Sequence, residues 1–235
     1  MELDYEFMAG TFGEVWKGAG VTLSLTALSL LLSFLPAFYL AVLRIRGNSA
    51  GSRLAALYVS FVRGTPIILQ ILLLYSLLPS LIHAALKAAG SGINIFETVD
   101  PFWYAVVVFT LNTTALLIEV FRSALLSIPK GQLEAGLSIG LSEFQTYLRV
   151  IMPQALVVAL PAVCNITVNL IKGTSLAFLM TVKDVMALGK IAASYGYNYI
   201  EAYLDVFLVY LVLCTLVQWS YHFAERRLGT FRGNA

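Results

Sequence analysis

Long stretches without a charged residue alternate with short polar segments along this chain. The charge-free stretches cover residues 18–43, 64–86, 101–118, 150–171 and 206–224. An α-helix rises about 1.5 Å per residue, so about 20 apolar residues cross a hydrocarbon core roughly 30 Å thick. The pattern therefore predicts one all-α integral membrane domain over residues 1–235, with five transmembrane helices at about residues 20–43, 67–86, 101–126, 150–171 and 203–224.

A charge interrupts the start of the second span. Hydropathy alone would extend this span back to Leu54, but Arg63 lies in between, and a charge deep in a bilayer is costly. Proline lacks the N–H for the helical ladder and disfavours helical geometry in the residue before it. We expect a helix break at residues 64–66, a span that begins near Ile67, and Arg63 at the inner interface. A continuous kinked helix is the alternative.

The arginines determine the orientation of the spans. If the N-terminus is outside, all nine arginines and Lys130 fall on or near the cytoplasmic side, whereas the outer segments carry five lysines. Because cytoplasmic loops are enriched in Lys and Arg, the chain is expected to be N-out and C-in. Its acidic start differs from a signal peptide, so residues 1–20 are expected to stay in the mature chain.

Residues 173–195 follow the fourth span on the outer side. They are moderately apolar, and their charges have roughly helical spacing, which predicts a short amphipathic or partly re-entrant helix. A sixth span here would place the arginine-rich C-terminus outside, against the charge rule.

Composition excludes several classes of protein. Hydrophobic residues make up 59% of the chain and charged residues 12%, which is too few charges for a soluble domain of this length. The net charge of +2 does not suggest a nucleic-acid partner. Cys164 and Cys214 both lie in apolar spans, so neither a disulfide framework nor a metal site is expected.

The cytoplasmic loop at about residues 129–149 is too polar for the bilayer. Leu133, Leu137 and Leu141 recur at four-residue spacing, which predicts a short helix on the membrane surface, and Gly140 and Ser142 interrupt it. A short helix with one apolar stripe can dock in a groove of a partner.

This loop resembles the signature of type I ATP-binding-cassette (ABC) importer permeases. That signature is Glu-Ala-Ala, three residues, Gly, nine residues, Ile, one residue and Leu-Pro; here Glu134-Ala135-Gly136, Gly140, Val150 and Met152-Pro153 stand in the same register. The resemblance implies a MetI-like permease fold in which this loop is a coupling helix that contacts a separate ATPase. The residues assigned to that contact are Gly131, Glu134, Ala135, Gly136 and Gly140. Gly136 replaces an alanine and is expected to soften the helix.

Further stretches resemble permeases for polar amino acids such as histidine, glutamine, glutamate, arginine, lysine and cystine. They are residues 61–66 with Gln70, Glu119 with Arg122 and residues 128–132, the run Lys172-Gly173-Thr174-Ser175-Leu176, and residues 225–228. The resemblance implies four partners besides lipid: a cytoplasmic ATPase dimer that holds ATP and magnesium, a second permease, an extracytoplasmic binding protein, and the amino acid itself. The second permease would be an identical or a related chain. This chain would bind no cofactor and would reside in a bacterial inner membrane.

Polar residues inside the predicted spans are candidates for the substrate pathway. Pro161, Asn165, Asn169 and Lys172 fall on one face of the fourth span. We expect this face to line a central cavity; hydrogen bonding between helices by the two asparagines is an equally weighted alternative. Other candidates are Asn112, Thr113, Glu119, Thr174 and Ser175. For Glu119 a structural ion pair with Arg122, three residues away, is favoured over substrate contact.

Two rival functions predict features that the sequence lacks. An ion-gradient transporter would show intramembrane acids or inverted repeats, and Glu119 is the single such acid that we identify. An enzyme would need a phosphate-binding loop or a catalytic constellation, and no catalytic residue is assigned. The prediction is therefore a non-enzymatic permease for polar amino acids that works by alternating access, with the ion-gradient transporter as the alternative.

Overall fold

The computed structural model describes residues 3–47 and 49–228, and every regular element in them is helical. Arg232, which the charge argument placed on the cytoplasmic side, lies outside these residues. The elements are α1 (Tyr5–Lys17), α2 (Ala19–Arg46), α3 (Ala50–Gly64), α4 (Ile67–Ala88), α5 (Ile95–Thr98), α6 (Pro101–Leu126), α7 (Gly131–Ser138), α8 (Glu143–Thr146), the π-helical turn η1 (Tyr147–Ile151), α9 (Met152–Gly173), the 3-10 helix η2 (Thr174–Met180), α10 (Val185–Gly196) and α11 (Tyr199–Leu228).

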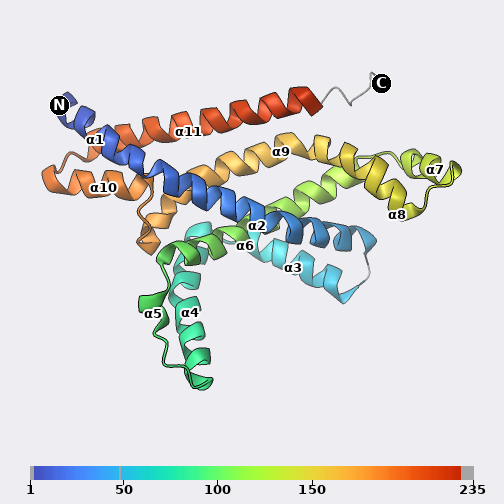
Figure 1. Cartoon of the computed structure of the whole chain (residues 1–235), viewed down its shortest axis with the longest axis horizontal. Coiled ribbons are helices and arrows are strands. Elements are labelled where there is room, and N and C mark those ends of the chain that lie inside the picture. The colour runs from blue at the N-terminus through green and yellow to red at the C-terminus, as the bar shows by residue number, and fades with distance from the viewer. Residues whose placement is uncertain (1–2, 48, 229–235) are drawn as a thin grey trace.

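Helices α2, α6, α9 and α11 run lengthwise through the molecule (Figure 1). Helices α1 and α10 lie together at one end, and α7 and α8 lie at the opposite end. Since the arginine distribution makes the α7–α8 end cytoplasmic, we call it the inner end and the α1–α10 end the outer end.

The most extensive helix pair is α2 with α6. Apart from Leu25, the buried positions of α2 carry small side chains, namely Ala19, Thr22, Thr26, Ser29, Ser33, Ala37 and Ala41. Small residues let two helix backbones approach closely, which is a common means of helix association in membranes. The larger buried side chains of α6, such as Phe109 and Phe121, then supply the volume of the core.

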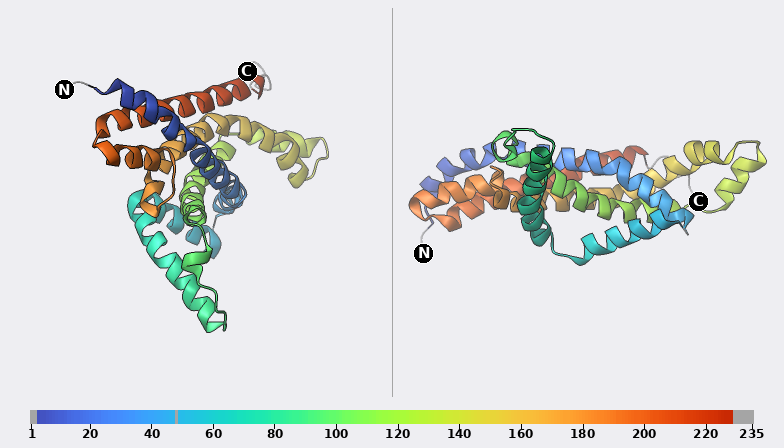
Figure 2. Two further views of the ribbon diagram at one scale, coloured as in Figure 1. Left: turned by 60° about the vertical axis from the view of Figure 1, so that its left-hand side comes forward. Right: turned by 90° about the horizontal axis from the view of Figure 1, so that it is seen from below.

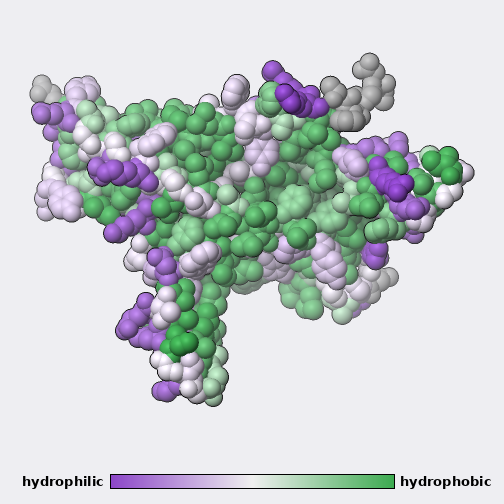
Figure 3. All heavy atoms as spheres, in the orientation of Figure 1, coloured by the Kyte–Doolittle hydropathy of each residue, from purple (hydrophilic) through white to green (hydrophobic). Residues whose placement is uncertain are grey.

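Apolar side chains cover the surface between the two ends, whereas hydrophilic residues gather at the ends (Figure 3). On α2, for example, Leu31 and Leu35 are 71% and 76% exposed. Within residues 3–47 and 49–228, five helical segments are long and apolar enough to cross a membrane: residues 5–46, 67–88, 101–126, 143–180 and 199–228. This confirms the expected class of fold.

The helix break before the second candidate span is present. α3 ends at Gly64, Thr65 and Pro66 are extended, and α4 begins at Ile67. α4 then leaves the bundle sideways instead of running along the other long helices (Figures 1 and 2).

The depth expected for Arg63 is wrong. The carbonyl of Val62 accepts a hydrogen bond from Gln70 Nε2 (2.8 Å), and Gln70 Oε1 accepts one from Asn112 Nδ2 (3.0 Å). Asn112 lies near the middle of α6, so Arg63 lies level with the middle of that helix and not at the inner interface. Hydropathy does not predict this position of Arg63. The two arginines of α3, one near each end, make the helix look like a polar interfacial segment, although it packs along α2 and α6.

The segment after the fourth span folds against the outer end of the molecule. Asp184 is fully buried and caps α10 by accepting a hydrogen bond from the Ala187 N–H (2.9 Å). Tyr210 Oη donates a second hydrogen bond to it (3.0 Å), while burial raises the pKa of this carboxyl above its usual value. α10 packs against both α1 and α11, so one side of this helix is buried in protein; its depth relative to the membrane stays a prediction.

Gly18 marks a close approach of two backbones at this end. A Cβ at Gly18 would lie 2.5 Å from the Val185 nitrogen and 2.7 Å from the Asp184 carbonyl carbon. Backbone atoms cannot rotate away, so we expect Gly18→Ala to destabilise the chain by about 1–3 kcal/mol. Gly20→Ala is the matched control, because a Cβ there meets nothing within 4 Å. Thermal unfolding of the purified variants should show a lower midpoint for Gly18→Ala alone; equal midpoints would contradict the close approach.

Candidate functional site

The inner end carries a helical hairpin made of α7 and α8, which we call the coupling hairpin (residues 131–146). Its turn depends on Gly140, which has φ +85°, a conformation that side chains with a Cβ rarely adopt. Ser142 then starts α8 with a capping box: its Oγ accepts from the Gln145 N–H (3.2 Å), and Gln145 Oε1 accepts from the Ser142 N–H (2.9 Å). The break predicted at Gly140 and Ser142 is therefore where the chain turns back.

Gly136 allows the two arms of the hairpin to pack closely against each other. It is the one buried residue of α7, and a Cβ there would overlap Thr146, lying 2.6 Å from its Oγ1. Thr146 is itself fully buried. The departure from the family's alanine at this position is thus matched by a threonine that occupies the space of the missing methyl group.

The outer surface of the hairpin is exposed and partly apolar. Glu134 and Ala135 are exposed, Leu137 is half-exposed, and Ile139 and Phe144 are 78% and 75% exposed. Large apolar side chains at a helical tip on the polar, inner side of a membrane protein are typical of a contact surface for another protein.

The predicted polar face of α9 exists as a continuous exposed strip. Pro161, Asn165, Asn169 and Lys172 are all exposed in the described chain. Pro161 and Asn165 also line a pocket of about 310 Å³ with three polar residues of α11, Gln218, His222 and Glu225. Nothing along α11 alone indicates that these residues face α9, so the sequence does not predict them as site residues.

A second polar group lies at the break between α3 and α4. Gln70 Nε2 donates to the Val62 carbonyl (2.8 Å) and to Thr65 Oγ1 (2.9 Å), and Gln70 Oε1 accepts from Asn112 (3.0 Å). Gln70 therefore satisfies backbone groups freed by the break and holds Asn112 at the same time. Gln70 belongs to one of the family-like stretches, but its contacts with Val62 and Asn112 are not predictable from the sequence alone.

The remaining candidates are not on this exposed surface. Thr113 and Thr174 are buried, and Thr174 Oγ1 donates to the Ile171 carbonyl (2.7 Å). Ser175 is partly buried in η2, which packs against α4, α6 and α9.

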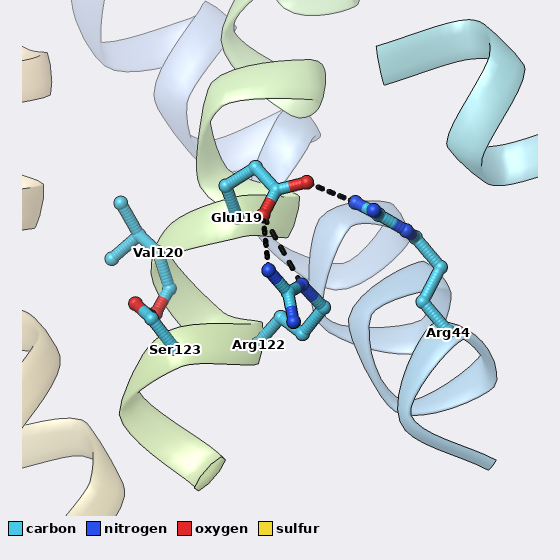
Figure 4. A network of polar contacts seen from close by, with 5 residues as sticks. All are labelled: Arg44, Glu119, Val120, Arg122 and Ser123. Atoms are coloured by element: carbon cyan, nitrogen blue, oxygen red, sulfur yellow. Dashed lines mark hydrogen bonds and ion pairs between the residues drawn. The ribbon is translucent and has the colours of Figure 1, made fainter. Parts of the chain in front are cut away.

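Glu119 is the centre of an ion-pair network (Figure 4). One carboxylate oxygen accepts from Arg122 Nε (3.1 Å) and Nη2 (2.9 Å), and the other pairs with Arg44 of α2. Both oxygens are therefore engaged by protein, which favours the structural interpretation over substrate contact. Arg44 was missed because it lies 75 residues away in sequence.

No group of three His, Cys, Asp or Glu residues in the described part of the chain is arranged to hold a metal ion. The candidate site consists of an exposed, partly apolar hairpin, a polar strip and two polar clusters inside a helical bundle.

Comparison with known proteins gives one consistent result. Residues 29–230 match the family described as the binding-protein-dependent transport system inner membrane component. The L-cystine transport system permease protein TcyL of Bacillus subtilis is 36% identical over 210 residues, which cover 88% of this chain and 84% of that protein. The probable amino-acid ABC transporter permease protein PatM of Vibrio harveyi is 35% identical over 224 residues, covering 94% of this chain and 96% of that protein.

Solved structures share the architecture. The crystal structure of an amino acid ABC transporter with histidines matches with a TM-score of 0.80 at 26% identity, covering 97% of this chain and 100% of that chain. The inward-facing MetNI methionine ABC transporter has the same fold, with a TM-score of 0.72 at 20% identity over 90% of this chain and 94% of that chain. These relatives and the five apolar helices make the chain a multi-pass protein of the bacterial inner membrane. With 202 of its 235 residues inside the matching region (residues 29–230), the chain belongs to the binding-protein-dependent transport system inner membrane component family.

Proposed function

We propose that the chain is the transmembrane permease of an importer for polar amino acids, powered by a separate cytoplasmic ABC ATPase dimer that binds ATP and magnesium. The coupling hairpin is the observation that carries this proposal. Its exposed Glu134, Ile139 and Phe144 form a docking surface at the inner end. The ATPase contact of Gly131, Glu134, Ala135 and Gly140 is part of the proposal. Gly136 is buried against Thr146, so it would affect this contact only through the packing of the hairpin.

The hairpin is connected so that its movement reaches the membrane helices. α6 enters the hairpin through residues 127–130, and η1 continues directly into α9. A displacement of the hairpin by a closing ATPase would therefore move α6 and α9 together. α9 carries the exposed polar strip, so such a movement would change access to it, as alternating access requires.

A second permease would complete the pathway. The strip of Pro161, Asn165, Asn169 and Lys172 is uncovered within the chain, and polar groups at membrane depth need a polar partner, a substrate or a water-filled cavity. Arg63 is exposed as well, at the level of Asn112. These residues support a polar cavity between two permeases, identical or related, that receives an amino acid from an extracytoplasmic binding protein.

Reconstitution tests the energy source. Proteoliposomes that contain this chain with its ATPase and binding protein should accumulate a polar amino acid only when ATP is present on the side of the membrane that the ATPase faces. The alternative function, an ion-gradient transporter, predicts uptake by this chain without the ATPase when a proton or sodium gradient is imposed. That second result would overturn the proposal.

The strip on α9 can be tested by one substitution. Asn169→Leu removes an exposed amide in the proposed pathway, and we expect uptake to fall roughly tenfold, the equivalent of about 1.4 kcal/mol of lost interaction. Thr215→Val is the control: Thr215 is exposed on α11, and its hydroxyl bonds only the Leu211 carbonyl (2.7 Å). Both variants should assemble with the ATPase to the wild-type extent. Full uptake by Asn169→Leu would remove this residue from the pathway.

A further inference from the structure

A large apolar groove lies between α9 and the last turns of α11, at the inner end of the molecule. We call it the inner groove; its volume is about 1120 Å³. Leu156, Val157 and Leu160 of α9 line one wall, and Tyr221 and Leu228 of α11 line another. Leu30 and Phe34 of α2 and Phe121 of α6 also face it.

Neither water nor a small polar solute suits these walls. An ordered water needs two or more polar partners, and most side chains that line the groove are aliphatic or aromatic. The volume exceeds the roughly 300–1,000 Å³ of typical small-molecule pockets. The groove lies between helices that are long and apolar enough to span a membrane, so lipid chains can reach it.

The cytoplasmic edge of the groove is basic. Arg149 and the amides of Gln132 and Gln154 line this edge, and among the described residues no aspartate or glutamate lines the groove. Arg149 is exposed and forms no ion pair with another residue among those that the structure describes. Lys130, next to the lining residue Pro129, adds a second positive charge. Basic pockets between membrane helices at the cytoplasmic face favour anionic lipid head groups.

We propose that the inner groove binds an anionic phospholipid of the inner leaflet, with its acyl chains along α9 and its phosphate at Arg149. The apolar walls and the single basic edge match an amphipathic anion of this size. Ile128, Pro129 and Gln132 at the base of the coupling hairpin also line the groove, so the bound lipid contacts the segment that joins the hairpin to the membrane helices.

Lipid binding can be measured on the isolated full-length chain, independently of transport. The purified chain is mixed in mild detergent with phosphatidylglycerol or with phosphatidylcholine of the same acyl chains, and retained lipid is detected by native mass spectrometry. We expect phosphatidylglycerol to be retained and phosphatidylcholine to be lost. Arg149→Gln should weaken phosphatidylglycerol binding roughly fivefold, the effect of about 1 kcal/mol for one basic residue at the membrane surface.

The matched control is Arg53→Gln, which removes an exposed arginine of α3 that does not line the groove and should leave binding unchanged. Equal retention of the two lipids, or equal losses in the two variants, would overturn the proposal. A phosphatidylglycerol with a photoreactive group in its acyl chain should label the α9 wall, and Val157→Trp should reduce that labelling. Labelling confined to other helices, or crosslinking of position 157 to a second permease chain, would assign the groove to another occupant.

Discussion

Glu119→Ala is expected to lower the free energy of unfolding by about 3 kcal/mol. The substitution leaves the guanidinium groups of Arg44 and Arg122 without their shared anion, and the side chains of Glu119 and Arg44 are only 22% and 18% exposed. Breaking a buried ion pair costs about 3–5 kcal/mol because the remaining charge is uncompensated; the partial exposure here favours the lower end. Reversible unfolding in mixed detergent micelles measures the change.

Glu14→Ala serves as the control for this prediction. It breaks the Lys17–Glu14 pair (2.6 Å), whose side chains are 68% and 64% exposed, and exposed pairs contribute little to stability. The double variant Glu119→Ala with Arg44→Ala should be less destabilised than the sum of the two single variants, because the residues share one network. Additive effects, or a change no larger than that of Glu14→Ala, would show that the network does not stabilise the α2–α6 pair.

Gly136→Ala is expected to reduce ATP-dependent transport roughly tenfold. The added Cβ overlaps the buried Thr146 side chain, and overpacking a well-filled contact costs about 1–3 kcal/mol. The two arms of the coupling hairpin must then separate, so the exposed surface that we propose for the ATPase changes shape. ATP-dependent uptake and co-purification of the ATPase both report this loss.

A second substitution distinguishes the overlap from a general effect on the helix. Gly136→Ala combined with Thr146→Ala removes the atoms nearest to the new Cβ and should recover most of the transport. Gly13→Ala adds a methyl group to a helical glycine of α1, where nothing lies within 4 Å, and it should transport normally. If Gly136→Ala transports as well as Gly13→Ala, the packing at Gly136 has no role in coupling.

Local sequence signals predicted several features of the site correctly. The helix break at residues 64–66 follows from the proline, which acts on its covalent neighbours. The turn of the hairpin at Gly140 and the pairing of Glu119 with Arg122 likewise depend on residues a few positions apart. The resemblance to ABC permeases rested on such local runs, and the family match confirms it.

Contacts between distant segments could not be predicted in this way. Glu119 is also bound by Arg44, 75 residues away, and Asn112 is held by Gln70, 42 residues away. The threonine that explains Gly136 lies across the hairpin, and the groove beside Arg149 needs four helices to form. Arg63 was placed at the wrong depth because hydropathy does not reveal that α3 packs along α2 and α6.

The sequence by itself determined the membrane environment, the number of apolar helices, their breaks and the family of the chain, because each depends on composition or on neighbouring residues. The tertiary structure alone decided the direction of α4, the depth of Arg63, the partners of Glu119 and the inner groove (Figures 1 and 4). Those features arise where side chains from separate helices pack together, and that packing depends on how all the helices fit at once rather than on any one of them.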